Sequence, residues 1–151
     1  MNRLFMILIA DDDANDRKLV EMALRRNGKP VEVREVTDGS EVIRYLRGEG
    51  QFDDRSKFPL PDLLLVDLKM PIMDGLQVIE ALRKELEFVP FLIVMLSGSG
   101  LVKDIAEAYR LEANSYIQKP EDFSEYVKKL GIVIDYWLIT EMVKSDGGFY
   151  P

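Results

Sequence analysis

The sequence of 151 residues contains neither cysteine nor histidine. Without cysteine, the chain can form no disulfide, no thiolate metal site and no cysteine nucleophile. Without histidine, it can hold no histidine-ligated zinc, build no Ser-His-Asp triad and form no phosphohistidine of its own. Any chemistry carried by this chain must therefore rest on carboxylates, hydroxyls and lysines.

Basic residues are fewer than acidic ones, and long apolar segments are missing. The chain has 20 lysines and arginines against 27 aspartates and glutamates, which gives a net charge of -7. Binding to a nucleic acid needs a surplus of positive charge. The apolar runs, such as "FLIVML", are too short to span a bilayer, and aspartates follow the first run where a signal peptide would have its cleavage site. We expect a cytoplasmic protein that binds neither nucleic acid nor membrane.

The spacing of apolar residues alternates between strand and helix five times along the chain. Spacing typical of strands occurs at 4–10, 31–36, 62–68, 91–96 and 114–118. Spacing typical of helices occurs at 14–28, 40–48, 75–85, 102–113 and 121–143. Because parallel strands need crossover connections, this order predicts an α/β fold with helices on both faces of a parallel sheet. We expect one domain over residues 1–143, a short tail at 144–151 and an exposed loop at 49–61.

Polar residues stand where several of these strands end. Asp11, Asp12 and Asp13 follow the first strand, and helix capping explains only one or two of them. The ends of the third, fourth and fifth strands carry Asp67, Ser97 and Lys119. Since the carboxyl ends of parallel strands meet at one edge of a sheet, these side chains are expected to converge.

The residue types at this edge favour chemistry on phosphate. Oxygen ligands without histidine or cysteine suit Mg²⁺, or else Mn²⁺, and Asp11, Asp12 and Asp67 would supply three carboxylates. A carboxylate beside a divalent ion can act as a nucleophile toward phosphorus and form an acyl phosphate. Lys119 and Ser97 would then stabilise the charge on the transferred group.

Four motifs resemble the receiver domain of two-component response regulators. They are "DD" (11–12), "VDLKMPIMDG" (66–75), "LSGS" (96–99) and "SYIQKP" (115–120). The resemblance covers almost the whole chain and implies a flavodoxin-like fold, with a five-stranded parallel sheet in the order 2-1-3-4-5 and five helices. It also implies Mg²⁺-dependent acceptance of a phosphoryl group from a sensor histidine kinase, followed by a conformational switch that alters protein–protein interactions. Beyond its own phosphotransfer and autodephosphorylation, no enzyme activity is expected.

The same resemblance assigns roles to individual residues. Asp67 is implied as the phosphoacceptor. The implied metal contacts are Asp11, Asp12, Asp67 and the main-chain carbonyl of Lys69. The implied phosphate-binding and switch residues are Ser97, Lys119 and Tyr116, and the implied loop-shaping residues are Pro71, Gly75, Gly98 and Pro120. Asp13 falls outside the acidic pair of the family, and we expect it to cap the first helix.

The last helix carries more apolar residues than one stripe needs. The stripe expected to face the sheet consists of Phe123, Val127, Leu130, Ile134, Trp137 and Leu138. A second set lies on an adjoining face and consists of Tyr126, Val133, Tyr136, Thr140 and Val143. An exposed aromatic patch marks a partner surface, although the C-terminal extension could instead fold over it.

The loop at 49–61 and "DYWL" near the end resemble one subgroup, the stand-alone receivers paired with bacterial phytochromes. This resemblance implies a phytochrome-type kinase as partner. It also implies a homodimer through the fourth helix, fifth strand and fifth helix, with Tyr126, Val133 and Tyr136 on its face. Only "SDGGFYP" follows Lys144, which is too short for an effector domain, so we expect no DNA-binding output.

Two other classes of function stay open. In a haloacid-dehalogenase-type phosphohydrolase, Asp11 would be the nucleophile and Asp13 the acid/base, supported by Ser97 and Lys119. Against it, Ala14-Asn15 and "PEDF" replace residues that such enzymes need, and "VDLKMP" would have no role. The second class is a pseudo-receiver that acts only as an interaction module, and the intact set of site residues argues against it.

Overall fold

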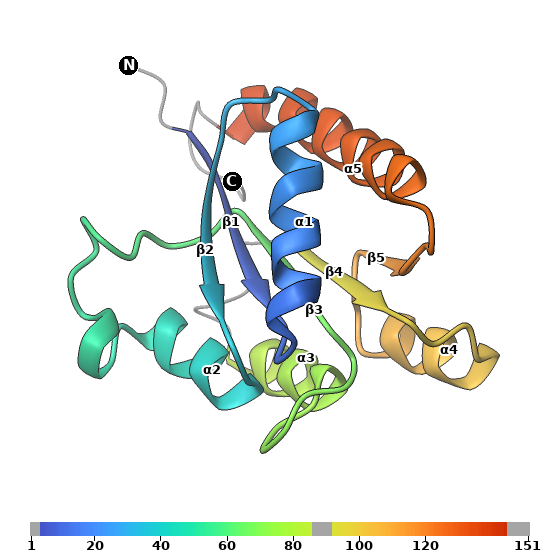
Figure 1. Ribbon diagram of the computed structural model, residues 1–151. Coiled ribbons are helices and arrows are strands. Elements are labelled where there is room, and N and C mark those ends of the chain that lie inside the picture. The colour runs from blue at the N-terminus through green and yellow to red at the C-terminus, as the bar shows by residue number, and fades with distance from the viewer. Residues whose placement is uncertain (1–3, 86–91, 145–151) are drawn as a thin grey trace.

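The computed structural model describes residues 4–85 and 92–144, and the side chains of the last helix as far as residue 136. A five-stranded parallel sheet in the order β2-β1-β3-β4-β5 forms the centre, and helices cover both faces (Figure 1). The strands are β1 (Phe5–Ala10), β2 (Val31–Val36), β3 (Leu63–Val66), β4 (Leu92–Ser97) and β5 (Ser115–Gln118). The helices are α1 (Ala14–Arg26), α2 (Gly39–Arg47), the short 3-10 helix η1 (Gly50–Phe52), α3 (Gly75–Lys84), α4 (Val102–Arg110) and α5 (Phe123–Lys144). The predicted fold class and strand order are confirmed.

Alternating residues of the central strands point into two separate cores. Met6 and Leu8 of β1 pack with buried residues of α2 and α3 on one face of the sheet. Ile7 and Ile9 pack with α1 and α5 on the other face. Because both faces are covered, every residue of β1, β3 and β4 is buried, which explains their continuous apolar runs. Among the nine residues of α4, in contrast, Ala108 alone is buried.

Side-chain caps set where helices α1, α2 and α3 begin. Asp13 is the N-cap of α1, where its Oδ1 accepts hydrogen bonds from the backbone N–H groups of Asn15 and Asp16 at 2.8 and 3.2 Å. The sequence-based prediction for Asp13 is therefore confirmed. At the start of α3, Asp74 and Gln77 form a reciprocal capping box.

Most residues of the loop at 49–61 are exposed, as expected, but part of the loop packs against α2. Phe52 is buried, and its ring lies 5.1 Å from that of Tyr45 and 5.3 Å from that of Phe58, centroid to centroid. Arg55 donates hydrogen bonds to the carbonyls of Tyr45 and Leu46 at the end of α2, at 2.9 Å each. Aromatic packing and the free carbonyls of a helix end therefore fix much of this loop against α2.

The prediction that Tyr126 lies on an exposed face of the last helix is wrong. Tyr126 is 4% exposed and belongs to the core shared with α1, because it lies one helical turn before the buried Leu130. Val133 is partly buried against the same core, whereas Tyr136 is 61% exposed. The two predicted faces of the last helix also included Trp137, Leu138, Thr140 and Val143. The side chains of these four residues lie outside the described part of the chain.

The predicted boundaries differ from the observed ones by a few residues. The strand expected at 62–68 covers only Leu63–Val66, so that Asp67 lies just beyond the strand, at the beginning of a loop. The helix expected at 102–113 ends at Arg110, and residue 91 lies outside the described residues. Within the described residues, no helix combines the length and the apolarity that crossing a membrane would need.

Candidate functional site

The polar strand ends converge at the carboxyl edge of the sheet. Asp11 follows β1, Asp67 follows β3, Ser97 ends β4, and Lys119 follows β5. From β1 the chain continues into α1 on one face of the sheet, and from β3 it continues into α3 on the other (Figure 1). The edge between β1 and β3 is therefore the topological switch point, where open α/β sheets bind their ligands.

Three carboxylates gather at this point. Each of Asp11, Asp12 and Asp67 offers an oxygen, and these oxygens all lie within 4.8 Å of one another. Asp11 is buried, Asp67 is 8% exposed, and Asp12 faces solvent. A purely carboxylate donor set with one open side fits a hard cation such as Mg²⁺ or Mn²⁺, which keeps some of its water ligands. The participation of the Lys69 carbonyl stays a prediction.

Lys119 links these acids by its ammonium group. Its Nζ donates hydrogen bonds to Oδ2 of Asp11 at 2.9 Å and to Oδ2 of Asp16 at 2.8 Å, and it lies 3.4 Å from Oδ2 of Asp67. Asp16 was not among the predicted site residues. The signal was present, because the cap at Asp13 places Asp16 in the first turn of α1, next to the end of β1.

Burial and neighbouring charges shift the pKa values of two of these groups. Burial raises the pKa of Asp67 to about 6; the charge of Lys119 opposes this shift, and that of Asp11 adds to it. Burial acts to lower the pKa of Lys119, but its hydrogen bonds with Asp16 and Asp11 and the charge of Asp67 raise it overall. Lys119 is therefore a permanent cation, while Asp67 is ionised at neutral pH and protonated in mild acid.

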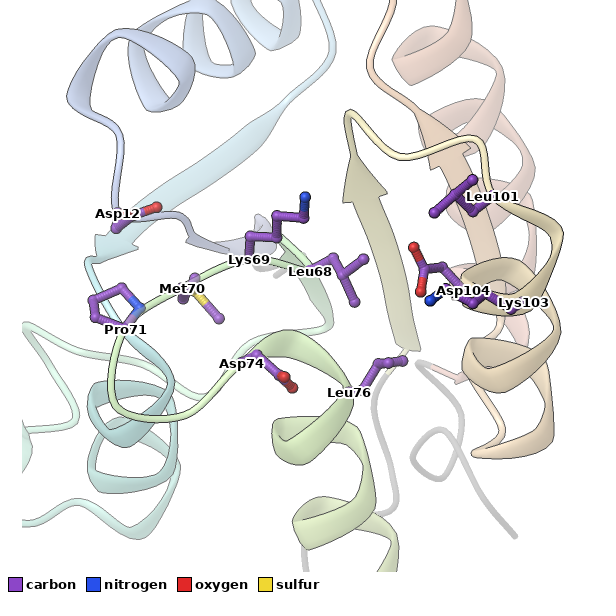
Figure 2. A pocket seen from close by; sticks show the side chains of 10 residues that line it. All are labelled: Asp12, Leu68, Lys69, Met70, Pro71, Asp74, Leu76, Leu101, Lys103 and Asp104. Carbon is purple, nitrogen blue, oxygen red and sulfur yellow. The ribbon is translucent and has the colours of Figure 1, made fainter.

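Two hollows open beside the phosphoacceptor candidate. One, of about 380 Å³, is lined by Asp67, Ser97 and Lys119, together with the loop from Gly98 to Leu101. The other, of about 650 Å³, adjoins the loop after β3. Figure 2 shows Asp12 and Pro71 on one side of this larger hollow and Leu101 with Asp104 on the other. Lys69 and Leu101 line both hollows, so a bound group in either one would contact the same loops.

The loop between β4 and α4 is fixed by hydrogen bonds around Ser99. The N–H of Ser99 donates a hydrogen bond to Oγ of the buried Ser97 at 3.1 Å, and the Ser99 hydroxyl donates one to Asp104 at 2.6 Å. The hydroxyl of Tyr116 donates to the Ser99 carbonyl at 2.8 Å. Tyr116 thus contacts the loop that carries Ser97, although its role as a switch stays a prediction. Neither Ser99 nor Asp104 was among the predicted site residues.

Of the four residues that were expected to shape loops, Gly75 is the one for which close packing explains the residue type. A Cβ at Gly75 would lie 2.3 Å from the Asp67 carbonyl oxygen, so any larger residue would displace the phosphoacceptor candidate. A Cβ at Gly98 would meet open space, which gives no steric reason for glycine there. Pro71 accepts a hydrogen bond from the Met73 N–H at 2.7 Å, and Pro120 directly follows Lys119.

Comparisons with known proteins agree with this geometry. Residues 7–131 match the response regulator receiver domain. Response regulator Rcp1 of Synechocystis sp. is 26% identical over 135 residues, which cover 89% of this chain and 90% of Rcp1. Its Mn²⁺-bound crystal structure has a TM-score of 0.78 to this chain at 26% identity, covering 88% of this chain and 94% of that one.

Two further solved structures are similar. The response regulator RPA3017, from red light signaling of R. palustris, has a TM-score of 0.84 at 31% identity, covering 89% of this chain and 94% of that one. The phosphorylated cyanobacterial phytochrome response regulator RcpA has a TM-score of 0.81 at 32% identity, covering 90% and 95%. With its fold, its strand order and most of its length matched in this way, the chain belongs to the response regulator receiver domain family.

Proposed function

We propose that this receiver accepts a phosphoryl group on Asp67 from a sensor histidine kinase, in a reaction that depends on Mg²⁺. The observation that carries the proposal is the position of Asp67 in its hollow. One of its carboxylate oxygens lies within 4.8 Å of oxygens of the acidic pair Asp11 and Asp12, and its Oδ2 lies 3.4 Å from the Lys119 ammonium. A carboxylate that adjoins both a cation site and a fixed positive charge is suited to attack a phosphoryl group.

Each residue of the site has its own role in the transfer of the phosphoryl group. An oxygen of Asp67 attacks phosphorus, an O–P bond forms as the P–N bond of the donor breaks, and the donor imidazole keeps the electron pair of that bond. Lys119 and the Ser97 hydroxyl stabilise the negative charge on the transferred oxygens. Mg²⁺, held by Asp11, Asp12 and Asp67, supplies further positive charge to the phosphoryl group when bound. The enclosed position of Asp67, which is 8% exposed, limits access of water.

The hydrolase alternative is not favoured by the structure. In that mechanism Asp13 would act as the general acid/base, but its Oδ1 accepts the first free N–H groups of α1. We therefore propose a phosphoacceptor and not an enzyme that turns over an external substrate. Sustained hydrolysis of a phosphomonoester would contradict this assignment.

The partner that we propose is a kinase of the bacterial phytochrome type. The support is that RcpA is named as a phytochrome response regulator, and that RPA3017 acts in red light signaling. Phosphotransfer from such a kinase would take place in the cytoplasm. A purified phytochrome-type kinase should label the receiver faster than a panel of kinases from other sensor families.

The central test compares the wild type with Asp67→Asn, which keeps the shape of the side chain and removes the nucleophile. With acetyl phosphate and Mg²⁺, the wild type should take up one acid-stable, base-labile phosphoryl group, whereas the variant should take up none. Equal labelling of both proteins would exclude Asp67 as the acceptor. An unlabelled wild type would favour a pure interaction module.

A further inference from the structure

We propose that Gly39, the first residue of α2, is a positioning residue that holds the loop between Asp67 and Gly75 in its metal-binding conformation. This inference rests on the proposed function of that loop. Gly39 lines neither of the two hollows described above, and its influence would pass through Met73.

The contact between Gly39 and Met73 leaves no room for a side chain. Gly39 is buried, and a Cβ added to it would lie 2.1 Å from the carbonyl oxygen of Met73 and 2.7 Å from its Cβ. Real Cβ atoms essentially never approach closer than 3.0 Å. The nearest atom belongs to the backbone, so no side-chain rotation can relieve the overlap. Gly39 does not have a positive φ, and the need for glycine is therefore one of space.

The loop that receives this contact is closed on itself. Its last residue, Gly75, donates its N–H to the Leu68 carbonyl at 2.8 Å and lies against the Asp67 carbonyl. In its middle, the Met73 N–H donates to the Pro71 carbonyl at 2.7 Å across Ile72, which has a φ of +69°. This is a γ-turn, a tight conformation with little freedom to adapt. A displacement of Met73 would therefore reach Asp67 and Lys69.

The helix on the other side of the contact is firmly held. Asp38 caps α2: its Oδ1 accepts the Glu41 N–H at 2.9 Å and the Ser40 hydroxyl at 2.6 Å. Further along α2, Val42, Tyr45 and Leu46 are buried in the core that it shares with α3. Since α2 cannot easily retreat, a methyl group at Gly39 would displace the loop at Met73, and the displacement would disturb the geometry of the cation ligands that the loop carries.

The chain offers a matched control at Gly131 in α5. This glycine is also buried, and a Cβ there would lie 2.3 Å from Oδ1 of Asn27, in the seam between α1 and α5. Both Gly39→Ala and Gly131→Ala should lower the melting temperature in metal-free buffer. Electron paramagnetic resonance of Mn²⁺ would then measure metal binding to each full-length variant. Gly39→Ala should raise the Mn²⁺ dissociation constant about tenfold, as outer supports of metal ligands typically do, whereas Gly131→Ala should leave it unchanged.

A Gly39→Ala protein that binds Mn²⁺ as tightly as Gly131→Ala would overturn the proposal, because Gly39 would then serve packing alone. If Gly39→Ala does not fold, Asp38→Ala decides, since it frays the start of α2 without adding an atom. That variant should weaken Mn²⁺ binding about twofold through loss of the cap, and unchanged binding would equally overturn the proposal. A wild type that binds Mn²⁺ but takes no label from acetyl phosphate would refute the phosphoacceptor function alone.

Discussion

Burial of the Asp67 carboxylate lowers the stability of the folded protein by an amount that depends on pH. The pKa of Asp67, about 6, lies above the ordinary value of 3.8, so between these values the folded protein binds more protons than the unfolded chain. Stability therefore falls as the pH rises through this window, and the full cost is present above pH 6.

We predict that Asp67→Asn stabilises the metal-free protein above pH 6, by about 2 kcal/mol after allowance for solvent screening. The gain should shrink toward pH 4, where Asp67 is protonated in the wild type, and also when saturating Mg²⁺ offsets the charge. Thermal melts in EDTA from pH 4 to pH 7 would measure it. A difference that stays constant over this range would show that burial does not control the ionisation of Asp67.

The backbone conformation of Ile72 also lowers the stability of the protein. Ile72 has a φ of +69°, which branched side chains rarely adopt, and it is 79% exposed. Because asparagine tolerates this region, Ile72→Asn should stabilise the protein by about 1 kcal/mol. Chemical denaturation would measure the change. Leu60→Asn is the control, since Leu60 is also an exposed apolar residue but has no positive φ, and equal effects of the two changes would argue against backbone strain.

At the scale of elements, the start of α1 gives two neighbouring aspartates different roles. Asp13 caps this helix, and Asp12 faces the cation site. We predict that Asp13→Ala destabilises the protein by about 1 kcal/mol and leaves Mn²⁺ affinity unchanged. Asp12→Ala should weaken Mn²⁺ binding and cost little stability in metal-free buffer, because crowded carboxylates repel one another. Weaker Mn²⁺ binding by the Asp13 variant would make Asp13 a ligand.

Local sequence patterns predicted the elements better than they predicted the contacts between them. The runs that form β1, β3 and β4 were recognisable because both faces of these strands are buried. Tyr126 was misplaced because a helical wheel does not show how wide a stripe the sheet and α1 cover together. The convergence of Lys119 with Asp11 and Asp67 followed from the strand order, but the contact of Gly39 with Met73 joins segments far apart in sequence, and no local pattern encodes it.

At the scale of the whole molecule, the homodimer expected from the sequence would involve α4, β5 and α5. With Tyr126 buried, the exposed apolar side chains on these helices include Tyr109, Ile132 and Tyr136. An aromatic residue buried at an interface can contribute about 2 kcal/mol. We predict that Tyr136→Ala weakens dimerisation about thirtyfold and still accepts phosphate at Asp67. Phosphorylation should tighten the wild-type dimer.

Analytical ultracentrifugation with and without acetyl phosphate would test the dimer. Tyr45→Phe provides a control, because Tyr45 is a tyrosine of α2 that is buried in the core on the face of the sheet opposite to α5. A wild type that is monomeric in both states would exclude the dimer. A Tyr136→Ala dimer as tight as that of the wild type would place the interface elsewhere.

Because α4 buries so little of its surface, it can open locally at a lower free-energy cost than α2. Helices α2 and α4 are both nine residues long, but α4 buries only Ala108 against the sheet, and its neighbour β5 is only partly covered. Opening α4 therefore exposes little apolar surface, and its amide protons should exchange with deuterium faster than those of α2. If Asp67 is phosphorylated as proposed, the phosphoryl group would need to shift a local equilibrium by only a few kcal/mol, and the rest of the protein could stay folded while the surface of α4 changes.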